Sequence, residues 1–151
     1  MGVILALDVG EKRIGVAASD PLELLASPVT TLRRSDDRSA IAAIAKLVRD
    51  RGAERVVVGV PKTLRNEEGV IAQRVLRFVE RLRRELSVPV ETWDERLTTV
   101  QAERILRRPE APGRRRGRSK KRHRYIKEHV DQVAAVLLLE SYLSARGRRG
   151  D

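Results

Sequence analysis

Hydrophobic positions along the chain form two patterns, short continuous runs and stripes at helical spacing. Short runs bounded by Gly, Pro or Asp are typical of buried strands, and apolar residues three or four positions apart are typical of amphipathic helices. The runs predict strands at residues 3–8, 14–19, 28–32, 55–60 and 88–93. The stripes predict helices at residues 36–51, 67–86, 98–108 and 125–145. Three antiparallel strands followed by β-α units predict an α/β fold, with a mixed sheet and helices on its faces.

Turn and capping residues mark the boundaries of these elements. Gly10 and Gly15 allow a tight return between the first two strands. Ser35 is expected to cap the first helix and Gly52 to end it. We expect a single domain over residues 1–145, a loop over residues 109–124 and a frayed basic tail over residues 146–151.

The composition excludes several classes of protein. The chain has 151 residues, of which 41% are hydrophobic, so one globular domain with its own core is expected. It has no cysteine, which excludes disulfides, thiolate metal sites and a cysteine nucleophile. The chain opens directly into a strand, and its longest apolar run, residues 133–139, is far shorter than the roughly 20 residues of a membrane helix. We therefore expect a cytoplasmic protein without a membrane partner.

The charge is strongly positive, with 32 Lys and Arg residues against 21 Asp and Glu residues, a net charge of +11. A small basic domain usually meets a polyanion, and nucleic acid is the expected partner. The alternative is a lineage that uses arginine heavily throughout its proteins.

The basic residues are densest between residues 107 and 127, where Glu110 is the one acid. This segment leads into the last helix, so we expect it to hold phosphates beside the site described next, with Lys62 from another loop. The candidate contacts are Arg114, Arg115, Arg116, Arg118, Lys120, Lys121, Arg122, Arg124, Lys127 and Lys62. A solubilising loop is the alternative. Trp93 is expected in the core rather than as a base-stacking side chain.

Acidic residues stand at the ends of two predicted strands. Asp8 ends the first strand, and a charged group there is costly unless it is paired, hydrogen-bonded or bound to a metal. A turn aspartate before Gly10 is the alternative. Asp94 and Glu95 follow the last strand, whose alternation sends them to opposite sides, so one of the two is expected to face Asp8.

A third acid, Asp131, lies on or beside the apolar stripe of the last helix. A buried Asp paired with an arginine is the alternative interpretation. Three converging carboxylates favour a Mg²⁺ or Mn²⁺ site over a zinc site. Two such ions would suit in-line attack on a phosphodiester.

Four blocks of the sequence resemble the YqgF/RuvX family of RuvC-like nucleases. They are LDVG at 7–10, GVP at 59–61 with Gly69 after it, DERLTT at 94–99 and DQVAAVL at 131–137. The resemblance covers nearly the whole chain, and it implies an RNase H-like five-stranded sheet and a metal-dependent endonuclease. It also implies Holliday-junction resolution, processing of the 5′ end of pre-16S rRNA, or both. It assigns the metal to Asp8, Glu95 and Asp131, with Asp94 less certain a choice than Glu95.

Two other functions stay open at this point. One is a non-catalytic RNA-binding factor for ribosome assembly on the same fold. The other is an ATP-binding relative of the actin and sugar-kinase superfamily, which the chain is too short to complete. Branched DNA and pre-rRNA are both candidate substrates, and junction resolution needs two cuts and hence usually a homodimer.

Overall fold

The computed structural model describes residues 2–60, 66–94 and 119–149. Its sheet has the strand order β3-β2-β1-β4-β5. The strands are β1 (Val3–Val9), β2 (Arg13–Ser19), β3 (Ala26–Arg33), β4 (Ala53–Val60) and β5 (Val90–Asp94). β1, β2 and β3 are antiparallel neighbours, and β4 and β5 run parallel to β1. The expected mixed five-stranded sheet is confirmed.

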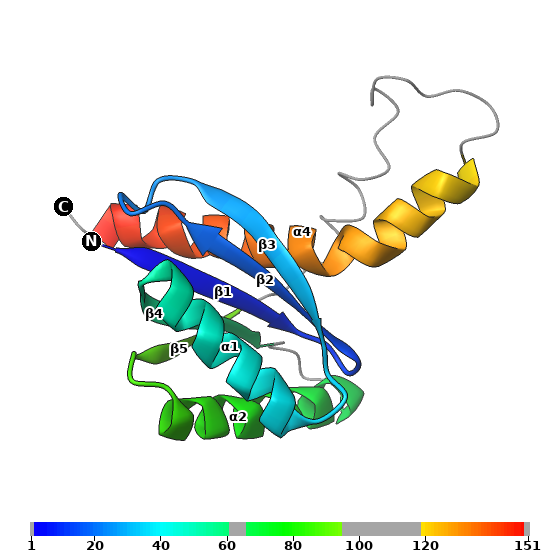
Figure 1. Cartoon of the computed structure of the whole chain (residues 1–151), viewed down its shortest axis with the longest axis horizontal. Coiled ribbons are helices and arrows are strands. Elements are labelled where there is room, and N and C mark those ends of the chain that lie inside the picture. The colour runs from blue at the N-terminus through cyan, green and yellow to red at the C-terminus, as the bar shows by residue number, and fades with distance from the viewer. Residues whose placement is uncertain (1, 61–65, 95–118, 150–151) are drawn as a thin grey trace.

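Helices cover both faces of this sheet (Figure 1). α1 (Asp37–Arg51) and α2 (Asn66–Glu85) pack on one face, and α4 (Ser119–Arg149) crosses the other. Alternation along β1 divides its residues between two cores. Leu5 and Leu7 belong to the core under α1 and α2, whereas Ile4 and Ala6 belong to the core under α4. Helices on both faces were expected from the β-α pattern.

The caps of α1 differ from the sequence-based expectation at one end. Asp36, not Ser35, is the N-cap, because its carboxylate accepts hydrogen bonds from both the backbone nitrogen and the hydroxyl of Ser39. A carboxylate at this position also interacts favourably with the positive, N-terminal end of the helix dipole. Gly52 ends the helix as expected, in the left-handed conformation with φ of 61°.

Two elements are longer than predicted. β3 extends over Ala26–Arg33, and Pro28 lies within it because β3 is an edge strand, where a missing N–H is tolerated. α4 begins at Ser119, so residues 119–124 are helical rather than part of a loop. Lys and Arg are good helix formers, and no Gly or Pro interrupts residues 119–146, so charge density alone was a poor guide.

α4 also continues past Ala145 to Arg149. The expected tail therefore starts too early, since Arg146 is helical and pairs with Glu23 at 3.0 Å. The predicted helix over residues 98–108 lies outside the described residues. Among the described helices, none has the length and apolarity that a bilayer crossing requires.

Candidate active site

A row of five residues runs across the sheet on one level. Thr31 of β3 pairs with Gly15 of β2, and Gly15 pairs with Asp8 of β1. On the other side, Leu7 pairs with Val58, so the next position in register aligns Asp8 with Gly59, and Gly59 pairs with Trp93 of β5. Asp8 therefore occupies the middle of the sheet with a glycine on each side.

Asp8 lies on the face of the sheet that α4 covers. Ile4 and Ala6 point into the core under α4, and alternation along β1 gives Asp8 the same side. The side chain is half-buried near the carboxyl end of its strand. In a sheet of this kind that end is where ligands bind, so the position suits a functional carboxylate.

Gly15 brings α4 close to Asp8. A Cβ built on Gly15 would fall on the backbone carbonyl of Asp131 and within 2.9 Å of the Asp131 Cβ. Only a residue without a side chain permits this approach, so the glycine is a contact point for the helix rather than part of the turn. The turn itself is closed by the Gly10 nitrogen, which donates to the Arg13 carbonyl at 2.8 Å. The backbone of Asp131 thus lies against the strand position opposite Asp8.

The carboxylate of Asp131 is short of partners. Its Oδ2 atom is buried, and no hydrogen bond from the described residues satisfies it. Arg13 Nε lies 3.2 Å from Oδ2 and forms an ion pair, although the orientation is not that of a hydrogen bond. Burial raises the pKa of Asp131 above its ordinary value, and the charge of Arg13 opposes this rise only in part. A further cation beside Asp131 would therefore stabilise its buried carboxylate.

We expect Asp131→Asn to raise the free energy of unfolding at pH 7 by on the order of 1 kcal/mol when metal is removed with EDTA. The folded protein raises the pKa of Asp131, so the folded state binds this proton more tightly than the unfolded state, and stability falls as the pH rises through the folded pKa. The gain should therefore vanish below the ordinary value of 3.8, where both states are protonated. Urea unfolding of both proteins between pH 7 and values below 3.8 measures this difference in stability.

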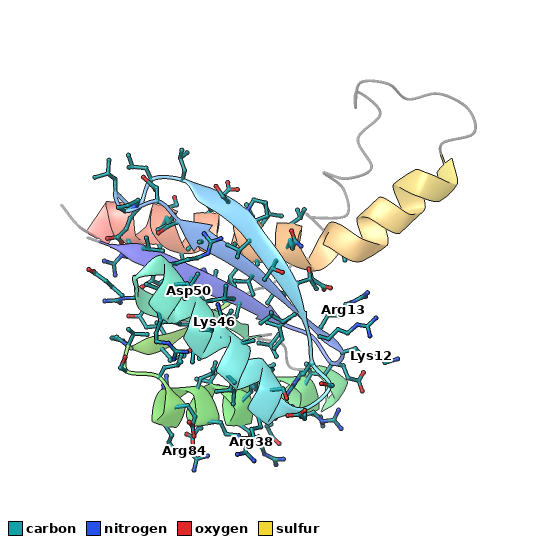
Figure 2. All side chains as sticks on the ribbon, viewed as in Figure 1. Lys12, Arg13, Arg38, Lys46, Asp50 and Arg84 are labelled. Atoms are coloured by element: carbon teal, nitrogen blue, oxygen red, sulfur yellow. The ribbon has the colours of Figure 1, made fainter. Side chains whose placement is uncertain are left out.

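The control for this prediction is Asp50→Asn. Asp50 is exposed on α1, and its hydrogen bond to Lys46 lowers the pKa, so its replacement should bring no gain (Figure 2). An Asp131→Asn protein less stable than the parent at pH 7 would contradict the argument.

Asp94 ends β5 and is the last residue of its described segment. Val90 belongs to the core under α1 and α2, so alternation places Asp94 on that face and Trp93 on the face of Asp8. Glu95 lies outside the described residues. Among the side chains that the structure describes, no three acidic or histidine residues are grouped to hold a metal.

The predicted basic contacts fall into two groups. Lys62, Arg114, Arg115, Arg116 and Arg118 lie outside the described residues. The backbone of the other five belongs to the first turns of α4, which extend past the sheet (Figure 1). These five are Lys120, Lys121, Arg122, Arg124 and Lys127.

Sequence reasoning missed two features of this site. Arg13 was not singled out, yet it pairs with Asp131, and Figure 2 shows it with Lys12 at the tip of the β1–β2 hairpin. Gly15 was assigned to the turn, although a glycine inside a strand signals close approach of another backbone. That signal was available in the sequence, but the identity of the approaching helix was not.

Comparisons with known proteins agree with this arrangement. A family model described as "RuvX: Holliday junction resolvase" matches residues 2–145. A Chloroflexus aurantiacus protein named "Putative pre-16S rRNA nuclease" is 49% identical over 144 residues, which are 95% of this chain and 88% of that protein. A protein of the same name from Caldanaerobacter subterraneus subsp. tengcongensis is 42% identical over 143 residues, covering 95% of this chain and 96% of that one.

Solved structures show the same fold. Thermus thermophilus RuvC in complex with a Holliday junction substrate matches with a TM-score of 0.52 and 19% identity, covering 97% of this chain and 96% of that chain. Fowlpox virus resolvase with junction DNA matches with a TM-score of 0.55 and 12% identity, covering 95% and 98%. At these identities the likeness concerns the fold alone, and it confirms the expected RNase H-like architecture.

Proposed function

Since this chain belongs to the RuvX family of Holliday junction resolvases, and is thus a nuclease, we propose that Asp8, Glu95 and Asp131 hold Mg²⁺ or Mn²⁺ for phosphodiester hydrolysis. The observation that carries this proposal is the buried Oδ2 of Asp131, which no described residue satisfies with a hydrogen bond. The backbone of Asp131 lies against Gly15, the residue of β2 that pairs with Asp8. A buried acceptor of this kind is costly without a partner, and a hard divalent cation is a suitable one.

The donor set fits such an ion. Asp8 and Asp131 supply carboxylate oxygens, which Mg²⁺ and Mn²⁺ prefer, and the chain has no cysteine that would favour a softer metal. A bound pair of ions would supply activation of water and stabilisation of the leaving oxygen. The protein's own part is to hold the acids on a rigid sheet and helix, with Arg13 beside Asp131.

Glu95 is preferred to Asp94 as the third acid. Alternation along β5 puts Asp94 on the face of α1 and α2, opposite to Asp8. Glu95 follows one position later in the sequence, so a continued strand would give it the side of Asp8. This choice supports the assignment that the family resemblance favours.

The proposed substrate is pre-16S rRNA, cut to form its 5′ end. Support comes from the relatives at 42–49% identity, whose names state this nuclease and whose lengths are nearly matched by this chain. A four-way DNA junction is the second candidate, because the family model carries that description. If the junction is the substrate, we expect a homodimer, because the two symmetric cuts of a junction need two active sites.

The basic residues in the first turns of α4 are proposed to hold the phosphates of the substrate. Lys120, Lys121, Arg122, Arg124 and Lys127 join the five basic residues outside the described segments in this role. Phosphate contacts release counterions, so log Kobs should fall linearly with log salt, by about 0.7 per contact on a single strand. We expect Lys120→Gln with Lys121→Gln to lower that slope by about 1.4 in filter-binding titrations.

The test is cleavage of a pre-16S rRNA fragment beside a four-way DNA junction, each with Mg²⁺, Mn²⁺ or EDTA. We expect a single cut in the rRNA fragment that depends on the metal. Binding without cleavage of either substrate in any metal would instead support a non-catalytic RNA-binding factor on the same fold.

A further inference from the structure

A groove of about 600 Å³ opens beside β5, on the side of the sheet where α4 ends. It is lined mainly by Arg55, Arg83, Glu91, Trp93, Tyr142 and Arg146. The lining carries three guanidinium groups against one carboxylate, so the groove is positive. β5 ends the strand order within the described sheet, so the groove lies at an open edge.

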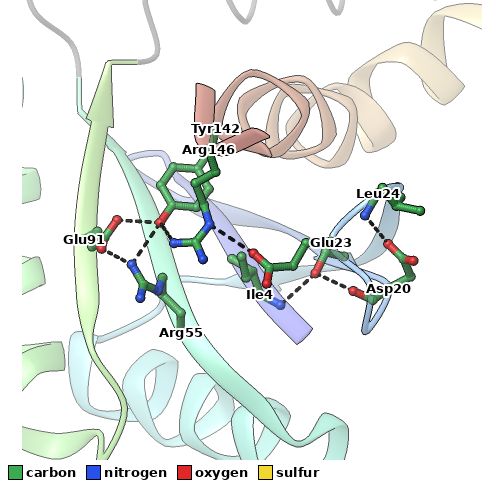
Figure 3. Close-up of polar contacts among 9 residues, drawn as sticks. Ile4, Asp20, Glu23, Leu24, Arg55, Glu91, Tyr142 and Arg146 are labelled. Carbon is green, nitrogen blue, oxygen red and sulfur yellow. Dashed lines mark hydrogen bonds and ion pairs between the residues drawn. The ribbon is translucent and has the colours of Figure 1, made fainter. Parts of the chain in front are cut away.

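The floor of the groove is fixed by a hydrogen-bond network around one phenol (Figure 3). The Tyr142 hydroxyl donates to Glu91 Oε2 at 2.6 Å and accepts from Arg55 at 3.1 Å and from Arg146 at 3.3 Å. Arg55 also pairs with Glu91, and Arg146 pairs with Glu23. Arg55 and Arg146 are thus paired with carboxylates of the protein itself, and these contacts hold the floor of the groove in one shape.

Arg83 and Trp93 are the lining groups left for a ligand. Arg83 uses its Nε to donate to the Val90 carbonyl at 3.1 Å, and among the described residues no carboxylate pairs with it. Trp93 packs edge-on against Tyr142 with ring centroids 5.4 Å apart, and its Nε1 donates to the Ser141 hydroxyl. Each of these two side chains is therefore held in place by a hydrogen bond and still lines the groove.

The groove is close to Asp8. Trp93, Gly59 and Asp8 occupy one level of three adjacent strands and the same face of the sheet. With neighbouring strands about 4.8 Å apart, Trp93 lies about 10 Å from Asp8 across the sheet. The position between them is Gly59, which carries no side chain. At about 3.4 Å per nucleotide of a stacked strand, this separation corresponds to about three nucleotides.

We propose that this groove binds an unpaired nucleotide of the substrate, about three positions from the cleaved bond, with its base against Trp93 and its phosphate on Arg83. The inference rests on the proposed function, since the cleaved bond is placed at Asp8. An indole ring and a guanidinium lining one groove suit a base and its phosphate without reading sequence. A base can reach the ring only when it is out of a duplex, so the ligand is a single-stranded flank.

The experiment compares RNA duplexes with and without a single-stranded tail, by fluorescence anisotropy in EDTA so that nothing is cut. We expect a tail of about six nucleotides to tighten binding about tenfold in the parent protein. Arg83→Gln and Trp93→Leu should each remove most of this gain, and Trp93→Phe should keep most of it. An abasic nucleotide scanned along the tail should be most harmful about three nucleotides from the bond that is cut.

Arg84→Gln is the matched control, because Arg84 is the exposed neighbour on α2, outside the groove lining, and the charge change is the same (Figure 2). It should keep the gain that the tail brings. Ser141→Ala tests whether loss of the Trp93 hydrogen bond alone has any effect, and it too should keep the gain.

Two results would overturn the inference. Cleavage by the parent protein with no gain in binding from the tail, or a gain that survives both Arg83→Gln and Trp93→Leu, would reject the groove and leave the nuclease assignment intact. Failure of the parent protein to bind or cut any nucleic acid would reject the proposed function and the groove together. A gain lost in Arg83→Gln and Trp93→Leu but kept in Arg84→Gln would support the groove.

Discussion

Replacing Asp8 by Asn is expected to lower the rate of cleavage by about a thousandfold or more, while leaving the fold and substrate binding in place. A metal ion contributes several kcal/mol to stabilising the charge of a phosphoryl transition state, and each 1.4 kcal/mol is a factor of ten in rate. Asn has nearly the shape of Asp but lacks the charge that holds the ion. Single-turnover cleavage with Mn²⁺, together with circular dichroism and anisotropy in EDTA, measures the three properties separately.

The controls for this prediction use Asp94, which ends β5, and Glu95, which follows it in the sequence. Glu95→Gln should be as inactive as Asp8→Asn, whereas Asp94→Asn should keep most of the activity because Asp94 lies on the other face of the sheet. Thermal unfolding gives a second readout, since Mn²⁺ should raise the melting temperature of the parent protein but not of Asp8→Asn. Full cleavage by Asp8→Asn would rule out this active site.

The second large effect is expected from Gly15→Ala. The new methyl group would meet the Asp131 carbonyl well inside 3.0 Å, and a backbone atom of a packed helix cannot turn aside as a flexible side chain can. Overpacking of this kind costs about 1–3 kcal/mol of stability. The helix must also move away from β2, which carries Asp131 away from Asp8, so cleavage should fall more than the loss of folded protein explains. Urea unfolding and single-turnover cleavage measure the two effects.

Gly69→Ala is the matched control for Gly15→Ala. Gly69 lies in α2, and a Cβ there meets nothing within 4 Å. Because Ala is the better helix former, this substitution should stabilise the protein by about 0.5–1 kcal/mol. The same chemical change is thus expected to have opposite signs at two positions. Equal effects would show that the contact between Gly15 and α4 is not the one described.

Local signals in the sequence were good guides to the elements of the sheet. Within the described sheet, apolar runs located β1, β2 and β4, because a strand buried between two layers of helices is apolar on both faces. Asp8 stood out for the same reason, since a charge in such a strand is expensive. Charge density misled at residues 119–124, where the absence of Gly and Pro was the better guide, and Ser35 lost the N-cap position to the carboxylate of Asp36.

By itself the sequence determined most of the secondary structure that the structure describes, the α/β class, the positive charge and the acids worth considering. These follow from composition and from the periods of helices and strands, which act over a few residues. Only the tertiary structure decided which backbone lies against Gly15, that Arg13 reaches Asp131, and which face Trp93 shares with Asp8. Such relations depend on strand order and on the crossing of α4, and segments far apart in the sequence carry no local signal of how they meet.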